Sequence, residues 1–218
     1  MISQKRFEKV WKDLHYGRAP KISGAKIFKD IRARYAEPHR VYHAESHLEA
    51  GLKEFDSCTD KFALPLEAEM AWYFHYAVCA PVYDFSMIGQ NEKASAELVE
   101  EKATNSGIHE ARIYFMKNFI METQMFVEPS NSDRSYLIDV DYSILGRPSE
   151  VFAQYEKDVR QEYKDMPEAL FRERRGMFLN RILSRHNIFW NGLFKGKYEA
   201  QARRNLEGSL KRLNDGVE

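Results

Sequence analysis

The sequence predicts an all-α protein. Apolar residues recur every three or four positions in one segment after another, which is the spacing of one face of an α-helix. Nowhere does the chain sustain the two-residue alternation, with turn dipeptides between, that strands would need. Hydrophobic residues make up 44% and charged residues 30% of the chain, an ordinary balance for a globular protein.

The first three predicted helices each have one apolar face. Ser23 is a suitable N-cap for the second of them, and Pro38 separates it from the third because proline disfavours helix at the residue before it. The three helices and their apolar positions are 3–15 (Phe7, Val10, Trp11, Leu14), 24–36 (Ile27, Ile31, Tyr35) and 40–56 (Val41, Leu48, Leu52, Phe55).

The fourth predicted helix, residues 66–79, is apolar on most sides. Such a helix is typical of the centre of a helical protein, and Pro81 ends it. The next predicted helix covers residues 90–105, and Gly107 is a good stop for it.

The second half of the chain carries five further predicted helices. Gly146 and Pro148 end one of them, Ser149 is a candidate N-cap for the next, and Pro167 begins another. We find no linker, repeat or low-complexity tract, so residues 1–218 are predicted to form a single domain. The five helices are expected at about residues 108–126, 136–145, 150–164, 167–186 and 198–213.

The composition argues against several classes of protein. Lys+Arg and Asp+Glu each total 33, so net charge gives no reason to expect nucleic acid or an anionic membrane as partner. The two cysteines, Cys58 and Cys79, are too few for a disulfide framework and indicate a reducing compartment. Without a signal region or a stretch near the ~18 apolar residues of a membrane span, we expect a cytoplasmic protein. The sequence leaves open whether the protein forms a homo-oligomer.

Three of the predicted helices carry side chains suited to a metal ion. His43 and His47 are four residues apart and would share one helix face, His75 lies in the apolar helix, and Asp139 and Asp141 lie in a third. Inward-facing imidazoles and carboxylates hold divalent metals in helical bundles. Each group also has an ordinary explanation: a hydrogen-bonded core histidine, a solvated histidine face, or surface and capping aspartates.

Six motifs follow one another along the chain: Pro38-x-Arg40-x-Tyr42-His43-x-x-x-His47, Trp72 to Pro81, Asn91-Glu92-x-x-Ser95-Ala96, Asp139 to Gly146, Arg160-x-Glu162-Tyr163, and Glu199 to Leu206. In this order they resemble the HD-domain superfamily of metal-dependent phosphohydrolases. They are most similar to a bacterial subfamily described as predicted HD-superfamily metal-dependent phosphohydrolases. The resemblance covers about residues 5–213, with the motif-bearing core at about 38–165.

The resemblance implies an all-helical, single-domain HD-type bundle that holds a divalent ion, whether manganese, magnesium, zinc or cobalt. The implied metal ligands are His47, His75 and Asp141, and His43 corresponds to the general acid of related cyclic-nucleotide phosphodiesterases. The implied reaction is hydrolysis of a small phosphate ester or nucleotide, with Arg40 or Arg160 holding the phosphate.

The chain departs from the family pattern at three places. Tyr76 stands where the family has the aspartate of the His-Asp pair, and Ala80 stands where the family has an aspartate before the proline. The segment 123–126, which ends in Phe126, lacks the histidine that the family has there. A phenol with an unperturbed pKa of about 10 is a poor replacement for a carboxylate at neutral pH. Three remaining ligands still suit one zinc-like ion with an open position, and Asp84 or Glu92 would be a replacement carboxylate.

Two functions therefore compete. In the first, the protein is a phosphohydrolase whose catalytic residues are His43, Glu92 and Arg40. In the second, it is an HD-like domain that binds a small ligand or a protein partner without catalysis, because Tyr76, Ala80 and Phe126 replace polar groups.

Overall fold

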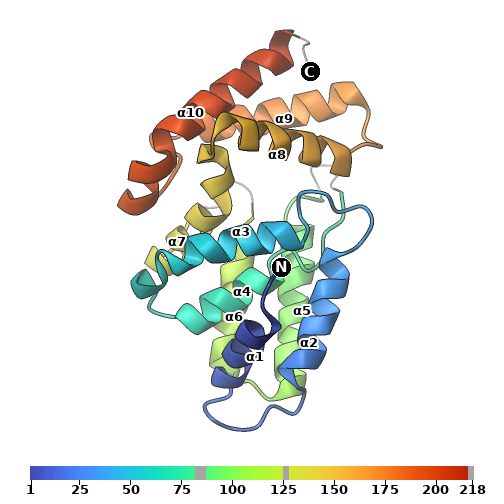
Figure 1. Cartoon of the computed structure of the whole chain (residues 1–218), viewed down its shortest axis with the longest axis vertical. Helices are drawn as coiled ribbons and strands as arrows, with labels where there is room; N and C mark the ends of the chain where they lie inside the picture. The colour runs from blue at the N-terminus through green and yellow to red at the C-terminus, as the bar shows by residue number, and fades with distance from the viewer. Residues whose placement is uncertain (82–86, 125–127, 216–218) are drawn as a thin grey trace. The chain divides into compact units, whose positions relative to one another are not determined.

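A computed structural model describes residues 1–81, 87–124 and 128–215, and it forms two compact units, Met1–Ile138 and Asp139–Glu218. These residues contain ten α-helices and the 3-10 helices η1 (Thr59–Lys61) and η3 (Ser143–Gly146), and none of them is in a strand (Figure 1). The all-α prediction is confirmed. The boundary between the units falls inside α7 (Ser132–Tyr142), and whether the chain is one domain stays a prediction.

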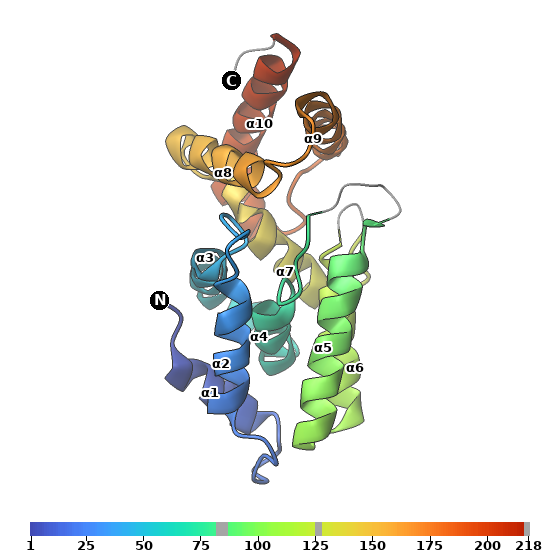
Figure 2. The same ribbon diagram turned by 90° about the vertical axis from the view of Figure 1, so that its right-hand side faces the viewer.

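The first unit is built around α4 (Pro65–Phe74), where every residue from Glu67 to Phe74 is buried. This helix packs against α1, α3, α5 and α6, which confirms that the apolar stretch is a central helix. Figure 2 shows α4 between the pair α1 and α2 and the pair α5 and α6. The surrounding helices are α1 (Gln4–Asp13), α2 (Gly24–Tyr35), α3 (Glu45–Asp56), α5 (Gln90–Ser106) and α6 (Glu110–Glu122).

Local signals in the sequence set several helix ends. The Ser23 side chain accepts a hydrogen bond from the Lys26 amide at the start of α2, as predicted for an N-cap. Gly107 ends α5 with a φ of 92°, a left-handed conformation that suits a residue without a Cβ.

Two helices differ from the prediction at the ends that lie close to the candidate histidines: α3 begins later than predicted, after His43, and α4 ends earlier than predicted, before His75. Helix α3 begins at Glu45, not near residue 40, so His43 precedes it and the prediction that His43 and His47 share a helix face is wrong. Val41, predicted to be a core residue, is 37% exposed. Helix α4 ends at Phe74 with His75 as its C-cap, well before Pro81.

The second unit contains the end of α7 and packs around α10 (Gly192–Asp215). This helix contacts η3, α8 (Ser149–Glu162) and α9 (Glu168–Leu183). A Cβ on Gly146 would lie 2.4 Å from the Tyr198 Cβ, so a glycine permits the close approach of η3 to α10. Ser149 is the first helical residue of α8 and Pro148 occupies the N-cap position, one residue earlier than predicted.

None of the helices in the described part of the chain combines the length and the apolar character needed to cross a membrane.

Candidate metal centre

His47 and His75 form the centre of the candidate site. His47 is buried in the first turn of α3, and His75 is fully buried at the end of α4. Their Nε2 atoms lie 3.0 Å apart, and each residue offers one ring nitrogen to a metal ion. Two residues 28 positions apart in the sequence thus bring two potential ligand atoms together.

The orientation of the His75 ring is fixed by its neighbours. Its Nδ1 lies 2.6 Å from the Trp72 carbonyl oxygen, and its ring stacks on the Trp72 ring at 4.0 Å. Because a carbonyl only accepts, Nδ1 carries the hydrogen and Nε2 keeps its lone pair. A backbone carbonyl that holds the outer nitrogen in this way is the usual arrangement behind a metal-binding histidine.

The distance between the two Nε2 atoms fits a shared divalent ion. Two imidazole nitrogens bound to one zinc at 2.0–2.1 Å would be about 2.9 Å apart at a right angle and about 3.3 Å apart at the tetrahedral angle. The observed 3.0 Å lies between these values. The histidine pair therefore needs little rearrangement to ligate one metal ion.

Burial keeps both histidines neutral at neutral pH. Desolvation lowers the pKa of His75 to about 3. Desolvation also lowers the pKa of His47 well below its ordinary value, and the nearby His75 and His43 lower it further. Neutral imidazole is the form that binds metal.

His43 lies beside this pair although it is not part of a helix. It is half-buried, and its ring centroid is 5.7 Å from that of His47 and 4.9 Å from that of Tyr42. The bend before α3 thus brings His43 to the place where a helix face was expected to put it.

Tyr76 fills the position where the family pattern has an aspartate. Its ring centroid is 4.2 Å from that of His43, 5.0 Å from that of His75 and 6.2 Å from that of His47. The three histidines therefore have an aromatic ring beside them where a carboxylate was expected.

Glu92 is a carboxylate that interacts electrostatically with His43. It is buried in the first turn of α5, and desolvation raises its pKa, while its own backbone amide and the charge of His43 act in the opposite direction. Asp84 and Phe126 lie outside the described residues.

Arg40 joins the His43 bend to the end of α4. Its side chain is 0% exposed, and it donates to the carbonyl oxygens of Tyr76 at 2.6 Å, Ala77 at 3.1 Å and His43 at 3.3 Å. Its Nε donates to the Glu37 carboxylate at 3.0 Å. Arg40 thus has a structural function in this site, and its predicted contact with a substrate phosphate stays a prediction.

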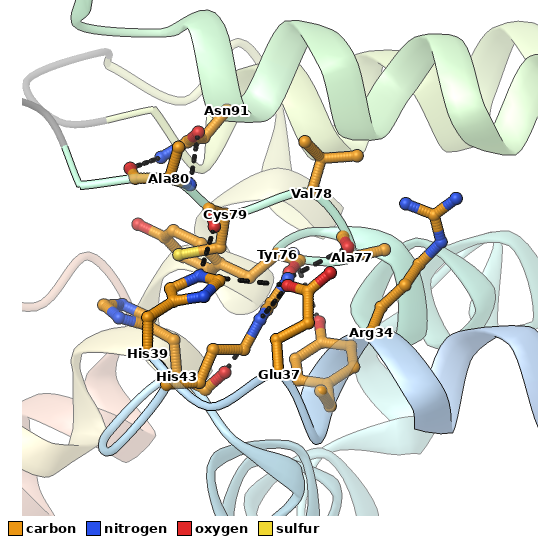
Figure 3. Close-up of polar contacts among 12 residues, drawn as sticks. Arg34, Glu37, His39, His43, Tyr76, Ala77, Val78, Cys79, Ala80 and Asn91 are labelled. Atoms are coloured by element: carbon orange, nitrogen blue, oxygen red, sulfur yellow. Dashed lines mark hydrogen bonds and ion pairs between the residues drawn. The ribbon is translucent and has the colours of Figure 1, made fainter.

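Three further side chains fix the segment that follows Tyr76. Asn91 and Ser95 lie one turn apart on α5. The Asn91 side chain makes two hydrogen bonds to the backbone of Ala80, and the Ser95 hydroxyl makes two to the backbone of Val78. His39 donates from Nε2 to the Cys79 carbonyl oxygen at 2.8 Å (Figure 3). The Asn91 and Ser95 spacing was visible in the sequence, but nothing there indicated His39.

In the second unit, Asp139 acts as a capping group. Its buried carboxylate accepts from the amides of Trp190 and Asn191 and from the Asn191 side chain, each at 2.8 Å. Desolvation raises its pKa to about 6 against these hydrogen bonds. Asp141 is half-buried near the end of α7 and influences the nearby phenols of Tyr142 and Tyr155. Of the two aspartates, Asp141 is thus the better candidate ligand.

The helical architecture and the histidine pair are compatible with an HD-like fold. Comparisons with protein-family models, with curated proteins and with solved structures find no match to this chain. Membership of the HD superfamily therefore stays a prediction.

Proposed function

We propose that the protein is a metal-dependent phosphohydrolase that acts on a small phosphate ester or a nucleotide. The observation that carries this proposal is the 3.0 Å separation of the His47 and His75 Nε2 atoms, with the His75 tautomer set by the Trp72 carbonyl. The proposed ligands of one divalent ion are His47 and His75, and Asp141 is the third ligand that the family resemblance implies. Such an ion supplies Lewis acidity at a phosphoryl oxygen and makes water more acidic.

The residues beside the histidine pair supply the other functions that hydrolysis needs. His43 is half-buried and within reach of the pair, which suits a general acid that protonates the leaving oxygen. Glu92 is a buried carboxylate that interacts electrostatically with His43. Arg40 fixes the backbone of His43 relative to Tyr76 and so sets the position of this acid.

The test combines metal analysis with an activity assay. Protein purified without chelators should contain close to one metal ion per chain, and it should release phosphate from members of a panel of nucleotides and phosphate esters supplied with manganese, magnesium, zinc or cobalt. His75→Gln should lose both metal and activity. The matched control is His186→Gln, because His186 is exposed and lies in the other unit. Wild-type protein with neither metal nor turnover under any of these conditions would refute the proposal.

One observation favours a second function, ligand binding without catalysis. The Tyr76 ring packs at 4.2 Å on the ring of His43, the proposed acid, and offers no carboxylate to a metal. If this function is the correct one, wild-type protein is inactive and Tyr76→Asp gains metal-dependent hydrolysis, whereas Tyr76→Phe does not. An active wild-type protein excludes the second function.

A further inference from the structure

The indole of Trp72 joins the two helices that carry the histidine pair. Trp72 lies in the last turn of α4, and its side chain is buried in the core of the first unit at 0% exposure. Its Nε1 donates to the carbonyl oxygen of Leu48 at 3.1 Å, and Leu48 directly follows His47 on α3. This hydrogen bond fixes the first turn of α3 relative to the end of α4.

The same residue contacts both rings of the pair. Between ring centroids, the indole lies 4.0 Å from His75, stacked at an angle of 20°, and 5.2 Å from His47. The Trp72 carbonyl oxygen also lies 2.6 Å from the Nδ1 atom of His75 and accepts its hydrogen bond. Ring and backbone of Trp72 therefore both constrain the orientation of the pair.

A glycine on α3 lets the indole come this close. Gly51 lies one helical turn after His47, and a Cβ built on it would be 1.8 Å from Cζ2 and 2.4 Å from Cε2 of Trp72. Any larger residue at position 51 would force the indole to move, because protein interiors leave little free space. The α3 backbone thus sets the position of the Trp72 ring.

We propose that Trp72 is a positioning residue that sets the distance between the Nε2 atoms of His47 and His75, and so the affinity of the pair for a divalent ion. That the pair holds a metal rests on the proposed function, whereas the contacts of Trp72 all lie within the first unit. Replacing a residue that orients metal ligands from behind typically changes metal affinity by about 10–100-fold.

Protein kept in EDTA gives a second measure of the same distance. With the two Nε2 atoms 3.0 Å apart, one must donate a hydrogen bond to the other. The hydrogen of His75 is on Nδ1, where the Trp72 carbonyl accepts it, so the donor is Nε2 of His47. This N–H is buried and should exchange slowly with water, which makes it visible by NMR.

The experiment measures the binding of cobalt ions by isothermal titration calorimetry to the full chain, stripped with EDTA and then freed of EDTA. Trp72→Phe keeps an aromatic ring but removes the indole N–H, and it should bind cobalt about 10–100-fold more weakly than the wild type. Urea denaturation of the same samples measures the loss of stability separately.

Trp11→Phe is the matched control and should bind cobalt like the wild type. Trp11 is also 0% exposed in the first unit, and its Nε1 also donates to a carbonyl oxygen, that of Ile22, at 3.0 Å. Its ring contacts among the described residues are with Phe7 and His15. The two variants should lose similar stability, so a difference in cobalt affinity reports positioning of the pair and not folding.

The outcomes separate this inference from the proposed function. Weaker cobalt binding by Trp72→Phe alone supports the inference even if the protein releases no phosphate from any substrate. Equal affinity of all three proteins, or equal weakening in both variants, overturns it even if the protein is an active hydrolase.

Two further results decide the remaining cases. If the wild type binds no cobalt, the NMR signal of the His47 N–H in EDTA decides: its loss in Trp72→Phe alone supports the inference, and the same result in all three proteins overturns it. If circular dichroism shows that Trp72→Phe does not fold, Gly51→Ala takes its place: weaker cobalt binding supports the inference and unchanged binding overturns it.

Discussion

Replacing Arg40 by methionine tests whether this arginine holds the candidate site together. Methionine keeps an unbranched apolar stem but removes four hydrogen bonds, three to carbonyl oxygens of His43, Tyr76 and Ala77 and one to Glu37. The Arg40 side chain is 0% exposed, so water cannot replace the lost donors without entering the core.

The size of the effect follows from these contacts. A hydrogen bond that involves a charged group contributes about 1.5–3 kcal/mol, and bonds that share one donor group are not additive. We therefore expect Arg40→Met to lower the free energy of unfolding by about 3–5 kcal/mol, a large part of the 5–15 kcal/mol of a typical protein. For a chain of this size the loss corresponds to a decrease of roughly 6–20 °C in the melting temperature.

Urea denaturation followed by circular dichroism measures this change. Arg34→Met is the control, because the contact of Arg34 with Asp30 is a single ion pair one helical turn away at 3.3 Å, and its loss should cost less than about 1 kcal/mol. A destabilisation below about 1 kcal/mol for Arg40→Met would refute the reasoning. Metal affinity should also fall in Arg40→Met, since His43 and the residues after His75 lose their common anchor.

Three further predictions concern stability. In EDTA the pKa of His75 is about 3 in the folded state and about 6.5 in the unfolded state, so the unfolded state binds more protons between these pH values. The contribution of His75 to the free energy of unfolding is therefore complete above pH 6.5 and falls by about 2–3 kcal/mol by pH 4.5. Urea titrations of His75→Gln at pH 6.5 and pH 4.5 should show a smaller loss than those of the wild type. A Cβ at Gly51 would lie 1.8 Å from Trp72, so Gly51→Ala should cost about 1–3 kcal/mol and alter tryptophan fluorescence, whereas Gly176→Ala, with no atom within 4 Å, should be neutral or stabilising; equal effects would contradict the packing argument. Asp139→Ala removes an acceptor of three hydrogen bonds and should destabilise by about 2–4 kcal/mol in the same urea assay, and an unchanged midpoint would show that the capping is unimportant.

The candidate site was only partly predictable from sequence. His75 drew attention because a polar ring in an apolar stretch needs a partner, and its pairing with His47 is what the structure shows. The reasoning about His43 used the wrong local structure, since the bend before α3 and not a helix face puts it near His47.

The sequence by itself determined the helices, because apolar spacing and capping residues act over a few positions. It specified a central helix at α4, a cap at Ser23 and a stop at Gly107. Only the tertiary structure decided which polar groups meet. It turned Arg40 inward onto backbone carbonyls and used Asp139 to cap a distant turn. Hydrogen-bond partners far apart in the chain are chosen by packing, and no local pattern records that choice.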